Sequence, residues 1–217
     1  MQILLCAATI FEIATTISYI KQKKLEHKIT VVITGVGLTA ATYSLTKEVL
    51  NRQPQLIIQA GIAGSLNENL ELTKTVVVKN DAIGDLGVFE NEQFKNIFEL
   101  ALVEKNSLPW KNERLLNSNI NVLEMTGLEI VDSVSIQEIT TDKNRIAYYK
   151  NKLGAEIETM EGAALHYVGL MENIPFLQLR SISNYAGERD KTKWNLEASI
   201  EQLNVELKQL LIKLLDL

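Results

Sequence analysis

The stretch I-T-V-V-I-T-G-V-G-L-T-A-A, residues 29–41, is the most informative part of the sequence for the fold. Its first six residues are apolar or β-branched, as in a buried strand, and Gly35 and Gly37 then interrupt the run. A helical pattern follows from Leu38 to Asn51, ahead of Pro54. A strand, a glycine turn and a helix in this order predict one unit of an α/β fold.

The same alternation continues on both sides of this unit. Gln2–Thr9 is a near-continuous apolar run, typical of a strand buried on both faces, and Phe11–Lys24 has a helical pattern. Further strands are predicted at 56–60, 73–79, 120–125, 128–134, 155–159 and 175–182, and further helices at 92–104, from 140 or 141 to near 153, at 161–172 and from 193 to the end. The length of 217 residues favours a single domain over residues 1–217.

Composition limits the classes of function that are open to this chain. A net charge of −5 without long basic runs argues against a nucleic-acid surface. No apolar run approaches the roughly 20 residues of a membrane-spanning helix. The single cysteine, Cys6, lies in an apolar run, which favours the reducing cytoplasm, and the two histidines form no metal-binding pattern with it. We therefore expect a cytoplasmic protein that binds a small molecule, with no nucleic-acid or membrane partner.

Two glycine motifs follow predicted strands. G-V-G-L-T-A at 35–40 fits the dinucleotide fingerprint, but the next strand ends Ile58-Gln59-Ala60 without the acid that binds the ribose, which argues against a dinucleotide site. A-G-I-A-G-S at 60–65 is predicted as a second glycine break whose backbone N–H groups cradle an anion or line a sugar. Lys and Arg are absent from 9–20, 35–46 and 59–72, which argues against inorganic phosphate as a co-substrate.

Carboxylates and amides stand where predicted strands end. Glu12 follows the first strand and is either a helix N-terminal carboxylate or a general base that activates water. The run I-E-T-M-E-G places Glu161 at a strand-to-helix junction, three residues after Glu158. Asn184 and the polar residues 187–190 follow the strand at 175–182. The carboxyl ends of strands are where α/β sheets bind ligands, although polar loops also occur there without function.

Taken in order, these motifs resemble those of the nucleoside phosphorylase and nucleosidase family over nearly the whole chain. They are Glu12 after the first strand, G-V-G-L-T-A-A, Q-A-G-I-A-G-S-L, E-T-M-E-G-A-A-L and R-S-I-S-N. The most similar nucleosidases have T-G-S-A-G, V-E-M-E and R-A-I-S-D at the last three places. The resemblance implies a three-layer α/β/α fold with a central mixed, twisted sheet flanked by helices.

The resemblance also implies roles for individual residues. Glu12 matches the carboxylate that positions and deprotonates the attacking water, and Met160 and Glu161 match a pair beneath the sugar, where the carboxylate accepts hydrogen bonds from ribose hydroxyls. Carboxylates at these places stabilise the oxocarbenium-like state of glycosidic cleavage. Gly61, Ile62 and Ile136 are expected to contribute to substrate binding.

Two departures from the adenosine-type pattern narrow the substrate. Asn184 stands where those nucleosidases have an Asp that protonates the purine N7; an amide donates a hydrogen bond there instead, as in enzymes of this family that act on 6-oxopurines. Gln59 stands where phosphorylases have an Arg in their R-V-G-S-type loop, so water is expected to replace phosphate.

The segment from Ser183 to Trp194 resembles the signature S-N-x-V-G-x-R-D-x-x-x-W of the futalosine-hydrolysing members, with Ala186 in place of the usual Val. These act in menaquinone biosynthesis and release hypoxanthine and dehypoxanthine futalosine. Futalosine carries a carboxyphenyl ketone on the 5′ side of its ribose, and Arg189 is our candidate for binding its carboxylate. The alternative is that Arg189 forms a surface ion pair with Asp190 or Glu188. Arg180, within an apolar strand, is expected to be structural.

The resemblance implies a homo-oligomer in which a neighbouring subunit completes the 5′ side of the site, and it implies no metal or cofactor. Other functions remain open. The chain could be a methylthioadenosine/S-adenosylhomocysteine nucleosidase or another purine nucleosidase, or, with less support, a phosphorylase. A protein that binds purine nucleosides without turnover is the alternative outside enzymes.

Overall fold

The computed structural model describes residues 1–216, and its organisation follows from the strand β1 (Ile3–Ala7), in which every residue is buried. Side chains alternate between the two faces of a strand. Ile3 and Leu5 therefore pack with one group of apolar residues, from α1 (Ile10–Gln22) and α6 (Leu196–Leu215), while Leu4 and Cys6 pack with another, from α2 (Leu38–Arg52) and α5 (Gly162–Met171).

The sheet is mixed, as expected. Its 8 strands are β1, β2 (Ile29–Ile33), β3 (Leu56–Ser65), β4 (Thr75–Ile83), β7 (Leu115–Leu116), β8 (Glu129–Ser135), β9 (Ile157–Thr159) and β10 (Phe176–Tyr185). Strand β1 pairs in parallel with β2 and β3, and β3 pairs in parallel with β10 but antiparallel with β9. Because β10 also pairs with β4, and β8 joins β4 to β9, the strands β3, β10, β4, β8 and β9 close into a ring.

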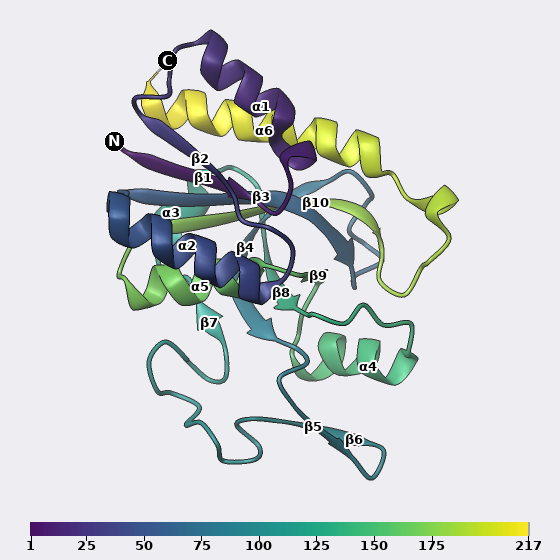
Figure 1. Cartoon of the computed structure of the whole chain (residues 1–217). Helices are drawn as coiled ribbons and strands as arrows, with labels where there is room; N and C mark the ends of the chain where they lie inside the picture. The colour runs from purple at the N-terminus through teal and green to yellow at the C-terminus, as the bar shows by residue number, and fades with distance from the viewer. Residues whose placement is uncertain (217) are drawn as a thin grey trace.

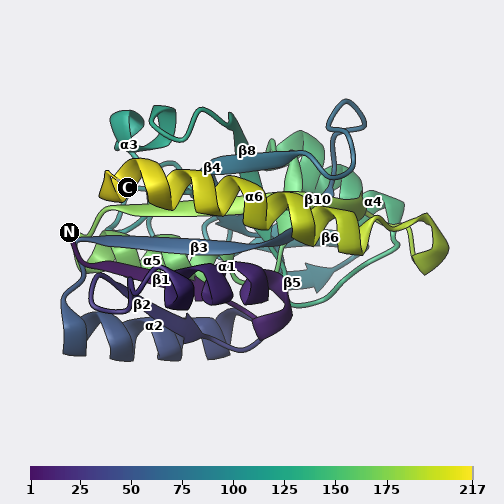
Figure 2. The same ribbon diagram turned by 90° about the horizontal axis from the view of Figure 1, so that it is seen from above.

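Helices cover both sides of this sheet, so the predicted three-layer α/β/α architecture is confirmed. Helices α1 and α6 lie together above the sheet in Figure 1, and α2 and α5 lie below it. Seen from above, α6 runs across the sheet beside α1 (Figure 2). No helix within residues 1–216 is both long and apolar enough to cross a membrane.

Two predicted elements have the wrong secondary structure. Residues 92–104, predicted as a helix, form part of a hairpin of β5 (Gly87–Glu90) and β6 (Gln93–Asn96) followed by turns. Residues 120–125, predicted as a strand, form the short helix α3 (Ile120–Glu124), whose N-cap is Asn119. The helix expected from 140 or 141 begins later, because Asp142 caps α4 (Lys143–Ala147), which continues as a π-helix, η1 (Tyr148–Lys152).

Among the strands that run further than predicted, β3 and β10 have extensions that shape the site. Residues 60–65 are no glycine break, because β3 continues through them to Ser65. Strand β10 continues to Tyr185 with a bulge between Ile182 and Asn184. A bulge changes the direction in which the following side chains point. Asn184 therefore pairs with Gly64 of β3 at the end of the sheet where the cavity lies.

Candidate active site

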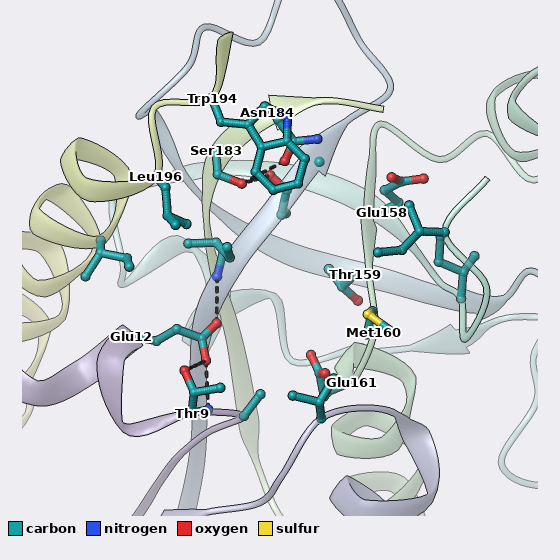
Figure 3. A pocket seen from close by; sticks show the side chains of 18 of the residues that line it. Thr9, Glu12, Glu158, Thr159, Met160, Glu161, Ser183, Asn184, Trp194 and Leu196 are labelled. Carbon is teal, nitrogen blue, oxygen red and sulfur yellow. Dashed lines mark hydrogen bonds between the residues drawn. The ribbon is translucent and has the colours of Figure 1, made fainter. Parts of the chain in front are cut away.

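A cavity of about 430 Å³ lies at the carboxyl ends of β1, β3, β9 and β10, a volume within the usual range for small-molecule sites. Much of its wall is apolar, with contributions from Phe11, Val36, Ile62, Ile136, Ile139 and Trp194. The charged and amide side chains that reach it are Glu12, Glu158, Glu161, Asn184 and Arg189. Figure 3 shows Glu12, Glu158, Glu161 and Asn184 around this space. The cavity therefore combines three carboxylates with one amide and one cation.

Glu12 is 8% exposed and both of its oxygens accept hydrogen bonds. Its Oε2 accepts from the backbone nitrogen of Thr9 at 2.9 Å and from the Thr9 hydroxyl at 3.0 Å, as in the N-terminal capping of a helix. Its Oε1 accepts from the backbone nitrogen of Ile62 at 3.2 Å (Figure 3). Glu12 thus caps α1, as one of its two alternatives expects, and it also lines the cavity, where its role as a general base stays a prediction.

Glu161 lies at the start of α5, next to Met160, and both residues line the cavity. Its Oε1 accepts a hydrogen bond of 2.9 Å from the backbone nitrogen of Gly37, the N-cap of α2, whose φ of 89° suits glycine. Burial raises the pKa of this carboxyl, against the opposing effect of the Arg180 guanidinium and the Gly37 N–H. The helix end after the first glycine motif therefore holds the protein's own carboxylate.

Arg180 and Gln59 lie beneath the cavity and do not line it. Arg180 is 1% exposed, and its Nη2 donates to Oε1 of Gln59, whose Nε2 donates to the backbone oxygen of Glu161 at 3.3 Å. A Cβ on Gly61 would lie 2.1 Å from Nη1 of Arg180 and 2.8 Å from Oε1 of Glu12. Gly61 thus gives the guanidinium room below Glu12, and Arg180 has the structural position expected of it.

Asn184 lines the cavity on the far side from Glu161 (Figure 3). Its Oδ1 accepts from the Ser183 hydroxyl at 2.9 Å, and its Nδ2 donates to the backbone oxygen of Tyr185 at 3.0 Å. The hydrogen bond from Ser183 occupies the amide oxygen, and the second N–H of Nδ2 remains available to donate to a ligand. This orientation suits a hydrogen-bond acceptor on the ligand.

Glu158, on β9, is 7% exposed and also lines the cavity. Its Oε2 is buried without a hydrogen-bond partner. Burial raises the pKa of this carboxyl to about 7, although the Arg189 guanidinium acts to lower it. A Cβ on Gly64 would lie 3.0 Å from Oε1 of Glu158 and 3.4 Å from Nδ2 of Asn184, so both side chains lie over the same glycine.

Arg189 is the cation that lines the cavity, on the loop between β10 and α6. Its guanidinium lies 5.7 Å from the centre of the Trp194 ring. Arg189 does not form the alternative surface ion pair with Glu188 or Asp190. Glu188 pairs with Lys193, and Asp190 accepts hydrogen bonds from Thr192. Within residues 1–216 no carboxylate forms an ion pair with Arg189.

The structure brings most of the predicted site residues together. Seven of them line the cavity, namely Glu12, Ile62, Ile136, Met160, Glu161, Asn184 and Arg189. The backbone nitrogen of Ile136 donates to the backbone oxygen of Thr159 at 2.9 Å, so this N–H is not free for a ligand. Gly61 does not line the cavity, contrary to the prediction that it binds substrate. Its lack of a side chain allows Arg180 and Glu12 to pack closely against the backbone there.

Glu158 is not among the site residues predicted from the sequence. A signal was present, because Glu158 precedes Glu161 by three residues in a short apolar strand, and a charged residue there has to face a partner or a cavity. The rim residues Phe11, Val36 and Ile139 left no such signal, because apolar side chains occur on any surface.

Comparison with known proteins shows the family to which this chain belongs. The phosphorylase superfamily profile matches residues 10–216. A futalosine hydrolase of Thermus thermophilus is 25% identical over 180 residues, which cover 82% of this chain and 79% of that protein. A 5′-methylthioadenosine/S-adenosylhomocysteine nucleosidase of Buchnera aphidicola is 26% identical over 197 residues, covering 88% of this chain and 80% of the other.

Solved structures show the same fold. A futalosine hydrolase of Helicobacter pylori superposes with a TM-score of 0.78 at 21% identity, and the match covers 97% of both chains. A mutant nucleosidase of the same organism, with 5′-methylthioadenosine in its active site, gives a TM-score of 0.79 at 20% identity, again over 97% of both chains. From its sequence match over residues 10–216 and its fold, this chain belongs to the phosphorylase superfamily.

Proposed function

We propose that this protein hydrolyses the N-glycosidic bond of futalosine and releases hypoxanthine and dehypoxanthine futalosine, a step of menaquinone biosynthesis. The observation that carries the proposal is the placement of Glu12 and Glu161 at one end of a single cavity and of the Asn184 amide at the other. The first pair suits a ribose and an attacking water, and the amide suits the acceptor edge of a 6-oxopurine.

The chemistry follows from these positions. Cleavage passes through an oxocarbenium-like state, which the carboxylates of Glu12 and Glu161 stabilise by their charge. Oε1 of Glu12 accepts a proton from water as the water oxygen bonds to the anomeric carbon. Glu161, held by the Gly37 N–H, accepts hydrogen bonds from the ribose hydroxyls, with Met160 beneath the sugar.

Water suits this site better than phosphate as the attacking group. A phosphate dianion held for reaction generally has Arg or Lys beside it. Arg180 is the cation near Glu12, but it is 1% exposed, engaged by Gln59 and lies outside the cavity wall. Gln59 does not face the cavity either, and among the described residues that line the cavity Arg189 is the one cation.

A second candidate is hydrolysis of methylthioadenosine or S-adenosylhomocysteine, which the similarity to the Buchnera nucleosidase favours. Asn184 weighs against it, because an amide has no proton to transfer to adenine. Arg189 and Trp194 favour futalosine instead, because a guanidinium beside an aromatic ring suits a carboxyphenyl group.

We further propose a homo-oligomer of single-domain subunits in the cytoplasm. Phe11 and Val36 line the cavity and are nonetheless 76% and 58% exposed. Apolar side chains at the rim of a site are expected to be covered, and a neighbouring subunit would cover them here.

Product analysis tests the function directly. The protein is incubated with futalosine, inosine or methylthioadenosine, with and without phosphate, and the free base and sugar product are identified by chromatography. We expect hypoxanthine from futalosine at a rate that does not depend on phosphate. Faster release of adenine from methylthioadenosine would support the second candidate, and strict phosphate dependence would exclude hydrolysis. Binding of hypoxanthine without turnover of any substrate would support a nucleoside-binding protein.

A further inference from the structure

The proposed reaction needs a proton that Glu12, Glu161 and Asn184 do not supply. When the bond between the ribose and N9 breaks, its electron pair moves into the purine, and protonation of the purine makes it a better leaving group. The Asn184 amide donates a hydrogen bond but has no proton to transfer. A general acid must therefore protonate the purine if the proposed function holds, and the assignment of this acid rests on that function.

Glu158 is placed to supply the proton. It lines the same cavity as Asn184, and both side chains lie over Gly64 of β3, from the strands β9 and β10 that pair with β3 on either side. It is 7% exposed, and its Oε2 has no hydrogen-bond partner. A carboxyl in such a place is normally paired or protonated, because an unpaired buried charge costs several kcal/mol. Glu158 therefore has no partner that stabilises its charge on Oε2, and its Oε1 lies over Gly64 beside Asn184, the residue expected to contact the base.

The groups around Glu158 favour its protonated form near neutral pH. Arg189, on the loop after β10, is the cation that faces it, and it acts against burial. Tyr149 of η1 is the other titratable group that interacts with Glu158: its pKa is raised mainly by burial and also by the charge of Glu158. With these influences together the pKa of Glu158 is about 7, so a large fraction of the protein carries the acid at pH 7.

The protonated form also matches a 6-oxopurine. The edge of such a base presents two acceptors, O6 and N7, whereas adenine presents an amino donor beside N7. Two acceptors require two donors. One free N–H of Asn184 and the O–H of a protonated Glu158 provide them, whereas an ionised Glu158 would place its own lone pairs against those of the base.

We propose that Glu158, as the carboxylic acid, is the general acid that protonates the leaving purine. Its O–H proton passes to N7 as the glycosidic bond breaks, while the amide of Asn184 donates to O6 and not to N7, the contact that the family resemblance implies for it. On the other side of the sugar, water loses a proton to Glu12 and its oxygen bonds to the anomeric carbon. The products are the neutral purine and the free sugar, and solvent returns the proton from Glu12 to Glu158.

The test compares a purine nucleoside with a substrate whose leaving group needs no proton. Wild type, Glu158→Gln and the control Glu172→Gln, an exposed position at the end of α5, are assayed from pH 5 to 9. The substrates are futalosine and p-nitrophenyl β-ribofuranoside, which releases a stable phenolate. Circular dichroism and thermal unfolding establish that each variant is folded.

We expect kcat/KM of wild type for futalosine to fall above pH 7, as the acid form of Glu158 is lost. Glu158→Gln should lower kcat/KM about 100-fold and remove this fall, within the usual range for a general acid. Cleavage of the nitrophenyl riboside should change less than about 3-fold, and Glu172→Gln should behave as wild type. An equal loss on both substrates, or an alkaline fall that persists in Glu158→Gln, would overturn the assignment.

Failure of the proposed function gives a different result. If wild type prefers methylthioadenosine, futalosine is the wrong substrate, and the same comparison is made with methylthioadenosine. If the nitrophenyl riboside is not cleaved, the pH profile of Glu158→Gln decides on its own.

Discussion

Glu12 and Glu158 lie on opposite walls of the same cavity and are almost equally buried, at 8% and 7% exposure, yet their surroundings differ completely. Three N–H and O–H groups donate to the oxygens of Glu12. Oε2 of Glu158 has no partner. Hydrogen bonds to a carboxylate stabilise its charged form, and burial without them stabilises the neutral form.

In the proposed mechanism, this difference assigns the base and the acid to two walls of one cavity. The wall built from α1 and β3 holds Glu12, the proposed base for water. The wall built from β9 and the end of β10 holds Glu158, the proposed acid for the purine. Pairs of carboxyls with opposite environments are a common basis of acid–base catalysis.

Removing the base should have the largest effect. In Glu12→Gln the amide cannot take a proton from water, so we expect kcat for futalosine to fall about 1,000-fold. The matched control is Glu26→Gln, at an exposed position after the same helix, which should retain wild-type kcat. Steady-state kinetics at pH 6.5 measures both. An unchanged kcat in Glu12→Gln would mean that the two walls do not have the roles given to them here.

The second prediction concerns Arg189, the cation that acts on Glu158. Arg189→Gln should raise KM for futalosine about 10-fold, because the substrate carboxylate loses its partner, and should leave KM for inosine, which has no such group, nearly unchanged. Because Arg189 acts to lower the pKa of Glu158, the alkaline fall in kcat/KM should also move to higher pH. Lys191→Gln, at an exposed position two residues on, is the control. An equal rise in KM for both nucleosides would place Arg189 away from the carboxyphenyl group.

The third prediction concerns stability and requires no turnover. Because the pKa of Glu158 is raised from 4.5 to about 7 in the folded protein, the folded state binds this proton more tightly than the unfolded state does. The associated stability is fully present below pH 4.5 and is lost as pH rises to 7, which amounts to about 3 kcal/mol. Glu158→Gln should therefore gain stability relative to wild type between pH 5 and pH 8.

Urea unfolding at the two pH values measures this change. Glu12→Gln should lose stability, whereas Glu158→Gln gains it, because the amide NH₂ of Gln would face the N–H donor of Thr9 or of Ile62. We expect it to lose about 1–3 kcal/mol at pH 8. If Glu158→Gln shows the same pH dependence as wild type, the Glu158 carboxyl has a partner in solution.

Sequence alone predicted the layers and most of the site, because the strongest signals are local. Continuous apolar runs such as Gln2–Thr9 identify strands buried on both faces, and polar residues at strand ends, such as Glu12 and Asn184, identify the ligand side. The errors lie where local signals are ambiguous. Residues 120–125 are apolar enough for a strand, yet the cap at Asn119 begins a helix there.

The extension of β3 could not be predicted for a different reason. Glycine ordinarily weakens a strand, so A-G-I-A-G-S looked like a turn. In the folded chain Gly61 and Gly64 are strand residues whose missing side chains give room to Arg180, Glu158 and Asn184, which come from other strands. The reason for each glycine is thus a neighbour distant in sequence. The environment of Glu158 was hidden in the same way, because its lack of a partner is a property of the assembled sheet.

The position of Trp194 gives the protein a built-in optical reporter. The chain has two tryptophans, and Trp110 lies outside the cavity, where it packs edge-on against Phe98 and Tyr167. In a Trp110→Phe variant, all indole emission would come from the ring that lines the cavity beside Arg189. Occupation of the cavity would then be visible as a change in fluorescence intensity, so each carboxylate variant could be titrated with hypoxanthine even when it no longer turns over.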